Sequence, residues 1–131
     1  KLSKVKTYKE FINHINLLKR KLLKLIKKVK KEGKIIHGYG ASTKGNVLLQ
    51  YYGINNKMIS YIAERNEEKY GLKTPGTNIK IISEASSRLK KPNYYLVLPW
   101  HFKKEILKRE KKTMLKGSKF IFPLPNLQIY K

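Results

Sequence analysis

The 131-residue sequence contains no cysteine and only eight acidic residues, against 31 lysines and arginines. Without cysteine the chain can form no disulfide, and it has no thiolate for a zinc site or redox centre. Its three histidines, His14, His37 and His101, form no His-x-x-x-His pair, so we expect no metal site. No apolar run approaches the roughly 20 residues of a membrane span, and no signal-peptide pattern opens the chain. These absences favour a soluble, cytoplasmic protein.

Arginine is also scarce, because the formal net charge of +23 comes almost wholly from lysine. A positive field of this size favours nucleic acid, anionic surfaces or phosphorylated ligands. Base readout and two-pronged phosphate binding, however, favour the planar guanidinium of arginine. Two interpretations therefore stay open: a lysine-rich solvated surface, or a site for a polyanion.

Residues 7–32 have the pattern of one amphipathic helix. Apolar residues recur there at spacings of three and four, from Tyr8 and Phe11 to Val29, and Gly33 ends the pattern. Such a helix packs on a sheet or a neighbouring domain, or lies on a membrane surface, and the ordinary width of the stripe favours packing. The chain does not begin with methionine, so we expect a domain of a longer protein. Its helical segment, 1–33, would pack on the α/β part, 34–131, or link it to a preceding domain.

After Gly33 short apolar runs alternate with helical patterns. The expected strands are 34–38, 57–64, 78–83, 93–100 and 118–125, with a sixth strand possible at 127–130. The expected helices are 43–52, 83–90 and 101–116. Strands that are apolar on both faces and alternate with helices indicate a parallel sheet covered on both sides. The predicted fold class is therefore α/β: a Rossmann-like, doubly wound, mostly parallel sheet of five to six strands preceded by a long amphipathic helix.

A glycine-rich turn, HGYGASTKGN (37–46), lies between the first expected strand and the following helix. Gly38 and Gly40 allow a tight turn and close approach to a ligand, and the helix start presents amide N–H groups to an anion. Thr43 stands where a G-x-G-x-x-G motif has its third glycine, and Asn46 stands where a Walker A motif has lysine. The turn is thus compatible with phosphate binding or with a purely structural role.

Further candidates follow the other strands. Glu64 ends the second strand about 20 residues beyond Gly40, where nucleotide-binding folds grip the ribose; a surface acid paired with lysine is the alternative. Trp100 and His101 end the fourth strand, where they could stack on and hydrogen-bond a ligand, or else fill the core and cap a helix. His37 is expected to be a buried, hydrogen-bonded histidine. No catalytic dyad or triad can be assembled from the sequence.

Four segments, HGYGASTKGNVLLQ, YIAERNEEKYGLKTPGT, YYLVLPWHFKKEIL and GSKFIFPLP, together resemble the C-terminal domain of the S-adenosylmethionine-dependent nucleotide-sugar C-methyltransferases. The resemblance implies a Rossmann-like third domain, preceded by a cysteine-rich zinc-binding domain and a methyl-donor-binding domain. The catalytic base, the zinc and the S-adenosylmethionine site are expected in those preceding domains. This domain would then enclose a nucleotide-linked keto-deoxysugar without catalysing methyl transfer itself.

On this basis we expect the glycine turn to cradle the diphosphate with bare amide groups, while residues after the second and fourth strands face the sugar or nucleoside. The expected ligand-binding residues are Gly38, Tyr39, Gly40, Ala41, Ser42, Thr43, Lys44, Glu64, Asn66, Trp100 and His101. No catalytic residue, metal ligand or resident cofactor is expected in this chain. The alternatives are a stand-alone dinucleotide- or S-adenosylmethionine-binding domain and a basic nucleic-acid-binding module.

Overall fold

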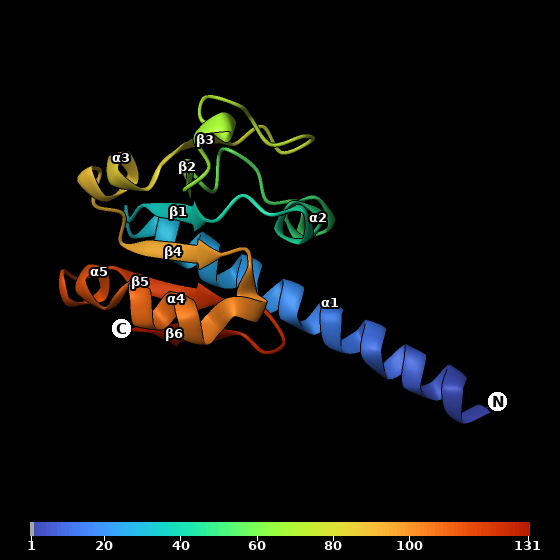
Figure 1. The fold of residues 1–131 in the computed structure, drawn as a ribbon. Helices are drawn as coiled ribbons and strands as arrows, with labels where there is room; N and C mark the ends of the chain where they lie inside the picture. Colours follow the sequence, from blue (N-terminus) through green and yellow to red (C-terminus); the bar gives the residue numbers. More distant parts are fainter. Residues whose placement is uncertain (1) are drawn as a thin grey trace.

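A long N-terminal helix leads into an alternation of strands and helices in the computed structural model, which describes residues 2–131 (Figure 1). The strands are β1 (Ile36–Tyr39), β2 (Tyr61–Glu64), β3 (Lys80–Ser83), β4 (Tyr94–Val97), β5 (Lys119–Phe122) and β6 (Gln128–Tyr130). The helices are α1 (Leu2–Lys31), α2 (Thr43–Tyr52), α3 (Glu84–Leu89), α4 (Lys103–Arg109) and α5 (Lys111–Leu115), with the 3-10 turns η1 (Glu67–Lys69) and η2 (Trp100–Phe102). None of the described helices is both long enough and apolar enough to cross a membrane.

The six strands form one sheet in the order β3-β2-β1-β4-β5-β6. The first five strands are parallel, and β6 runs antiparallel to β5. The chain moves outward from β1 to β3 and then returns to place β4 on the other side of β1. The direction in which successive strands are added to the sheet therefore reverses between β1 and β4. Ligands bind at this switch point in doubly wound folds. The predicted Rossmann-like fold is confirmed.

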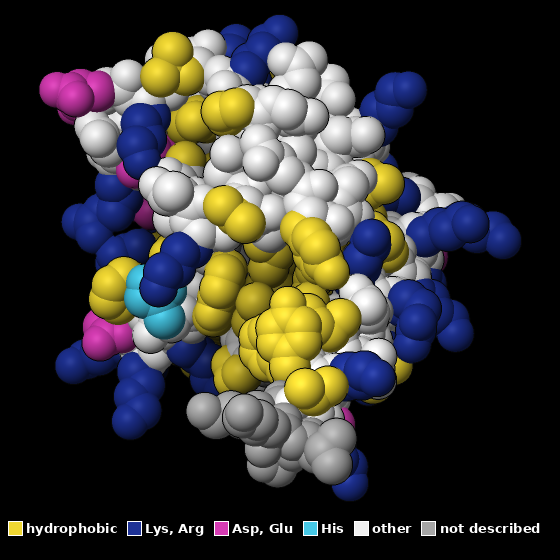
Figure 2. All heavy atoms as spheres, turned by 90° about the vertical axis from the view of Figure 1, so that its right-hand side faces the viewer, with side chains coloured by type: hydrophobic (Ala, Val, Ile, Leu, Met, Phe, Trp, Pro, Cys, Tyr) yellow, Lys and Arg dark blue, Asp and Glu magenta, His cyan; other side chains and the backbone are white. Residues whose placement is uncertain are grey.

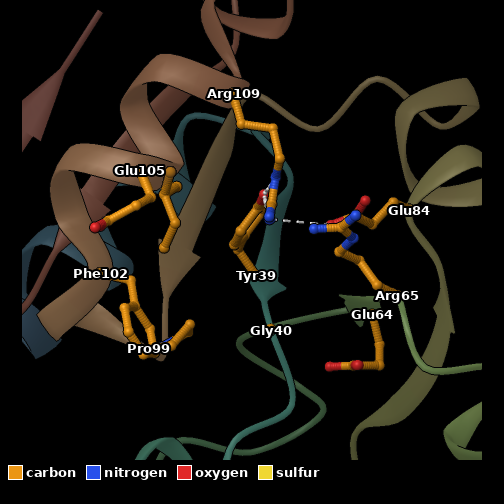
Figure 3. A pocket seen from close by; sticks show the side chains of 10 residues that line it. Tyr39, Gly40, Glu64, Arg65, Glu84, Pro99, Phe102, Glu105 and Arg109 are labelled. Carbon is orange, nitrogen blue, oxygen red and sulfur yellow. Dashed lines mark hydrogen bonds and ion pairs between the residues drawn. The ribbon is translucent and has the colours of Figure 1, made fainter.

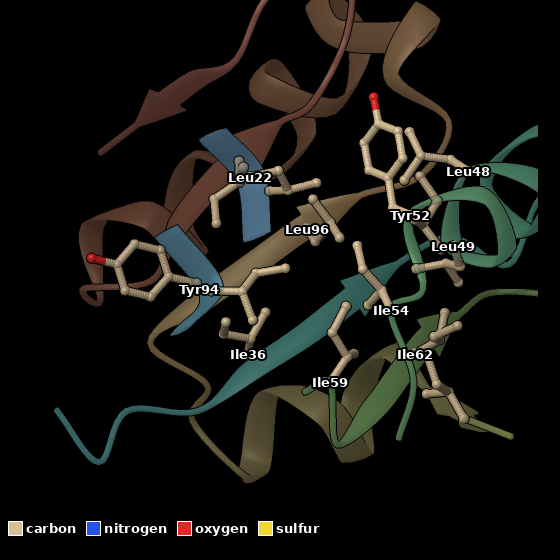
Figure 4. Packing of buried hydrophobic residues seen from close by; sticks show 14 of the residues in the cluster. Leu22, Ile36, Leu48, Leu49, Tyr52, Ile54, Ile59, Ile62, Tyr94 and Leu96 are labelled. Carbon is tan, nitrogen blue, oxygen red and sulfur yellow. The ribbon is translucent and has the colours of Figure 1, made fainter. Parts of the chain in front are cut away.

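Helices cover both faces of the sheet. On one face, α1 and α2 pack Leu22, Leu49 and Tyr52 against strand residues such as Ile36 and Leu96 (Figure 4). On the other face, α4 and α5 contribute Ile106 and Met114 to a second cluster built on the aromatic residues of β1, β4 and β5. The helix α3 joins this second face, since Ser87 hydrogen-bonds to residues of β1 and β4 there. Strands β1 and β4 are buried along their whole length, as parallel strands between two layers should be.

The first crossover is set by local chemistry around α2. Ser42 caps the helix, because its hydroxyl oxygen accepts a hydrogen bond from the Gly45 amide at 3.0 Å. Gly53 ends the helix in the left-handed conformation, with φ 70°. A Cβ on Gly45 would overlap the Leu98 side chain, so glycine at this position lets α2 pack closely on the strand. Gly45 thus fills the packing role of the third glycine in nucleotide-binding turns, two residues later than in that motif.

Several predicted boundaries are wrong. The expected strands 93–100 and 118–125 end early, at Val97 and Phe122. The expected helix 101–116 is divided into η2, α4 and α5, because Glu110 leaves helical geometry (φ −100°, ψ 18°) and its carboxylate turns into the interior. The expected strand 57–64 begins only at Tyr61, since the amides of Met58 and Ile59 bond back to the Asn55 carbonyl in a turn. The first helix begins at Leu2 rather than at residue 7.

The outer parallel strands, β5 and β3, are each covered by a further short piece of the chain. On one side, β6 pairs with β5 through residues 128–130 and forms the edge of the sheet. At the other edge the segment after η1 runs beside β3, where Gly71 donates to the Ile81 carbonyl at 2.9 Å and the Ile81 amide donates to Leu72 at 2.8 Å. The short β6 and this segment therefore satisfy backbone groups that an edge strand would leave exposed.

Candidate ligand-binding site

A cavity of about 380 Å³ lies at the carboxyl ends of β1 to β4, at the switch point of the sheet (Figure 3). Its lining comes from the ends of these strands and from the helix that follows β4. The lining residues are Tyr39, Gly40, Glu64, Arg65, Glu84, Pro99, Phe102, Glu105, Ile106 and Arg109. Of the eleven predicted ligand-binding residues, the structure brings Tyr39, Gly40 and Glu64 together in this cavity.

The cavity has one apolar side and one charged side. Pro99, Phe102 and Ile106 form the apolar side, and the Phe102 ring is about half exposed. Opposite them, Glu84 and Arg109 reach toward each other and form an ion pair at 3.6 Å (Figure 3). An apolar wall facing carboxylates suits an uncharged ring with several hydroxyl groups, because the ring face packs on the wall while the hydroxyls donate to oxygen.

Glu64 joins the cavity to the glycine turn. One carboxylate oxygen accepts the Ala41 amide at 2.7 Å, and the other accepts the Asn66 amide at 2.8 Å. These two charge-assisted hydrogen bonds hold the β1–α2 turn against the end of β2. An ionised carboxylate has about four acceptor positions, so Glu64 keeps capacity for hydroxyl donors from a ligand.

The amide groups of the glycine turn are mostly engaged by protein oxygens. Gly40 donates to the Ala63 carbonyl at 2.8 Å and Ser42 to the Gly40 carbonyl at 3.1 Å, in addition to the Ala41 bond to Glu64. The prediction of bare amides is therefore wrong for these three residues. Only the amides of Thr43 and Lys44, in the first turn of α2, have no acceptor among the described residues. Lys69 adds a cation at this turn, where its ammonium group donates to the Ala41 carbonyl at 2.7 Å.

Gly40 lies where the glycine turn contacts Pro99, just after the end of β4. Its φ of 81° is in the left-handed region, and a Cβ there would stand 2.8 Å from Cδ of Pro99. Both facts require glycine at this position. Gly38 lies one step inside β1 instead, beside Ile62, and does not reach the cavity.

A buried ionic cluster fixes the floor of the cavity. Tyr39 donates its hydroxyl to Glu110 at 3.0 Å and accepts hydrogen bonds from Arg109. Glu110 is only 2% exposed and accepts two further hydrogen bonds from Arg88, at 2.9 and 3.0 Å, and one from Thr113. The cluster holds the Arg109 guanidinium at the rim of the cavity in one orientation.

The ionisation of this cluster follows from its surroundings. Burial raises the pKa of Tyr39 well above its ordinary value, so the phenol remains protonated. Burial also acts to raise the pKa of Glu110, but hydrogen bonds from Arg88 and Thr113 outweigh it and hold that pKa below the ordinary value. The carboxylate is therefore charged and paired, and with Glu84 it neutralises Arg88 and Arg109. The floor of the cavity thus carries little net charge.

Eight predicted positions lie outside the cavity lining: Gly38, Ala41, Ser42 and Thr43, described above, and Lys44, Asn66, Trp100 and His101. Asn66 caps η1, accepting the Glu68 amide at 3.1 Å. Trp100 is partly buried and packs against both core clusters, in line with the core-filling alternative. His101 is exposed in η2, between Trp100 and Phe102. Lys44 is exposed in the first turn of α2.

His37 has the buried, hydrogen-bonded environment expected of it. Its Nδ1 lies 2.7 Å from the Ser87 hydroxyl, which in turn contacts the Tyr95 hydroxyl at 2.8 Å. Burial, with a smaller effect from Lys90, lowers the pKa of His37 to about 4. The ring is therefore neutral near pH 7 and belongs to the core.

Sequence reasoning missed the cavity residues that come from η2 and α4, and it missed Arg65. Phe102, Glu105 and Arg109 recur at spacings of three and four after β4, a pattern that places them on one face of a helix at the carboxyl end of a strand. Arg65 directly follows Glu64. Both signals were present in the sequence.

The fold is that of a Rossmann-like domain with a cavity at its switch point, the position where ligands bind in doubly wound folds. The sequence profile of the family described as "C-methyltransferase C-terminal domain" matches residues 1–125, so the chain belongs to this family. It is similar to the C-methyltransferase NovU of Streptomyces niveus, with 33% identity over 122 residues. The match covers 93% of this chain and 29% of that relative, so the chain spans less than a third of the length of NovU.

Proposed function

We propose that this domain binds the nucleotide-linked keto-deoxysugar substrate of an S-adenosylmethionine-dependent C-methyltransferase and does not itself catalyse the transfer. The observation that carries the proposal is a switch-point cavity with one apolar and one carboxylate-bearing side, in a chain of the C-methyltransferase family. The methyl donor and the base that deprotonates the carbon beside the keto group would belong to other parts of a longer enzyme.

The carboxylates of the cavity support binding rather than proton abstraction. Glu64 already accepts two amides, and Glu84 is paired with two arginines. These contacts fix the orientation of both carboxyl groups, whose oxygens can accept hydrogen bonds from hydroxyl groups. A sugar or ribose ring on the Pro99 and Phe102 wall would present its hydroxyls to them.

The diphosphate belongs at the neighbouring start of α2 in this arrangement. The amides of Thr43 and Lys44 point out of the first helical turn, where the helix dipole favours an anion. Lys44 and Lys69 add positive charge on either side of the turn. The proposed site therefore has two neighbouring parts, a pocket for a sugar or ribose ring and a phosphate position.

The test is a titration of the 131-residue domain with nucleoside diphosphate sugars of each common base, with NAD and S-adenosylmethionine as comparators. Binding should shift the amide NMR signals of Gly40, Thr43 and Lys44. Phe102→Ala should weaken it roughly tenfold, because ring stacking on an aromatic side chain contributes about 1–3 kcal/mol. Lys104→Ala, an exposed neighbour outside the cavity lining, is the matched control and should change affinity little.

Two results would reject this function. Saturable binding of NAD or S-adenosylmethionine that exceeds that of every nucleotide sugar would indicate the stand-alone dinucleotide- or donor-binding alternative. Binding confined to nucleic acid, with an affinity that falls steeply with salt and with shifts only at surface lysines, would indicate a charge-driven module.

A further inference from the structure

The apolar stripe of α1 continues past the end of the domain that it packs on. Leu18, Leu22 and Ile26 are buried against the sheet. About two and three turns further toward the N-terminus, Phe11 is 58% exposed and Tyr8 is 67% exposed. Figure 1 shows this part of the helix extending beyond the strands and the other helices. The apolar stripe is therefore core at one end, while Tyr8 and Phe11 at the other end are exposed to solvent.

Contacts with the domain anchor the middle of α1. The His14 ring lies 3.2 Å from the Pro125 carbonyl, and Asn16 accepts a hydrogen bond from the Tyr51 hydroxyl at 3.2 Å. The segment before these contacts is about three turns long. This segment propagates from the docked part of α1 without tertiary packing of its own apolar face, and most helical stability in proteins comes from such packing, so a partner on this face would stabilise it.

The outer face of α2 adds to this apolar surface. Val47 and Tyr51, one helical turn apart, are 59% and 51% exposed. We name Val5, Tyr8, Phe11, Val47 and Tyr51 the docking surface. Figure 2 shows apolar side chains gathered on this side of the molecule, with lysine and arginine around them. Apolar side chains gathered in this way mark an interaction site, whereas single exposed ones are ordinary.

Charge argues against a second copy of the chain as the occupant. Lys6, Lys9 and Lys19 flank the stripe of α1, and each copy carries a net charge of +23. Pairing two such helices would bring like charges together. The complementary partner instead has an apolar patch bordered by carboxylates.

Two further observations point to a partner within the same polypeptide. The family profile matches residues 1–125, so the exposed part of α1 lies within the matched region. The similar relative has more than two thirds of its length outside the match. We infer that the docking surface packs against an apolar, acid-bordered face of the methyl-donor-binding part of the longer enzyme, an inference that rests on the proposed function.

The position of this surface gives the packing a consequence for the site. The exposed end of α1 extends on the side toward which β1 and β4 point (Figure 1). The ligand cavity opens at the carboxyl ends of these strands. A domain that packs on the docking surface would therefore lie beyond the carboxyl ends of the strands, as the cavity does. It would place the methyl donor near the bound sugar.

Amide hydrogen exchange tests the inference directly. Exchange of residues 5–13 is measured in the 131-residue domain and in the longer protein that contains it. Exchange in the longer protein should be at least tenfold slower over this segment and unchanged around α5. Equal exchange in the two proteins would overturn the inference.

A pair of glutamate variants separates packing from general destabilisation. Phe11→Glu and Leu115→Glu each replace an exposed apolar residue, and Leu115 is 87% exposed on α5, outside the docking surface. Both should leave the melting temperature of the 131-residue domain unchanged, and only Phe11→Glu should increase exchange and protease cleavage near α1 in the longer protein. Equal behaviour of the two variants there would contradict the inference.

Other occupants have their own signatures. Self-association of the 131-residue domain that Phe11→Glu abolishes would replace the inference with a homodimer. Binding to phosphatidylserine vesicles through the same residue, without protection in the longer protein, would replace it with a membrane surface. Failure of the nucleotide-sugar titration alone would reject the proposed substrate and leave the exchange result unaffected.

Discussion

The two faces of the sheet share the same strands but are stabilised in different ways. The face under α1 and α2, the aliphatic face, is filled by residues such as Leu22, Leu49 and Ile62. The face under α3, α4 and α5, the polar face, buries His37 and Glu110 among aromatic rings. The aliphatic face depends on the volume it fills, whereas the polar face depends on complete hydrogen bonding.

This division matches the position of the ligand cavity. Arg109, Glu84 and Tyr39, which line the cavity, are part of the ionic cluster of the polar face. The aliphatic face instead holds α2 on the sheet, because Leu48 and Leu49 of this helix belong to its core cluster. Loss of packing should therefore affect stability at all pH values, while changes in the polar face should affect pH dependence and the shape of the cavity.

The largest expected effect is on the aliphatic face. Leu49→Ala should reduce the free energy of unfolding by about 2–5 kcal/mol, because Leu49 is fully buried and its loss leaves a cavity. The loss should be the same at pH 5 and pH 8. Denaturant unfolding at the two pH values measures it, and a strongly pH-dependent loss would contradict the division between the faces.

His37 should give the polar face a pH dependence. Its pKa is about 4 in the folded chain and about 6.5 when unfolded, so the unfolded state binds the proton first as the pH falls. The contribution of neutral His37 is fully present above pH 6.5 and is lost between pH 6.5 and 4, by about 3 kcal/mol. In His37→Gln the slope of unfolding free energy against pH should flatten in this window; an unchanged slope would assign it to other groups.

A smaller effect is expected at Glu110. Glu110→Gln keeps the shape but removes the charge that Arg88 and Tyr39 use, and should reduce the free energy of unfolding by about 1–3 kcal/mol. Because the pKa of Glu110 is lowered, its stabilising contribution is present above the unfolded-state pKa and is lost as the pH falls through the folded-state pKa. The variant should therefore approach the parent protein in strong acid. Chemical denaturation at pH 7 and pH 3 compares them.

The fold could be predicted from sequence because each strand is a short apolar run bounded by turn residues, and the crossovers carry clear helix starts such as Ser42. The division of the helix after β4 could not be predicted, because it depends on hydrogen bonds between Glu110 and two residues of other elements, Arg88 and Tyr39. The engaged glycine turn escaped prediction for a similar reason. Ala41 meets a carboxylate 23 positions away, and a local pattern contains no sign of that contact.

The outer parallel strands are each covered by a short piece of the chain, β5 by β6 and β3 by the segment at 71–74. A peptide that added to this sheet by β-augmentation would therefore meet only short edges, β6 being three residues long. Association with the folded domain should then depend mainly on side chains, which can be replaced without altering the sheet. Homologous domains could then exchange partners by surface substitution while the sheet stays unaltered.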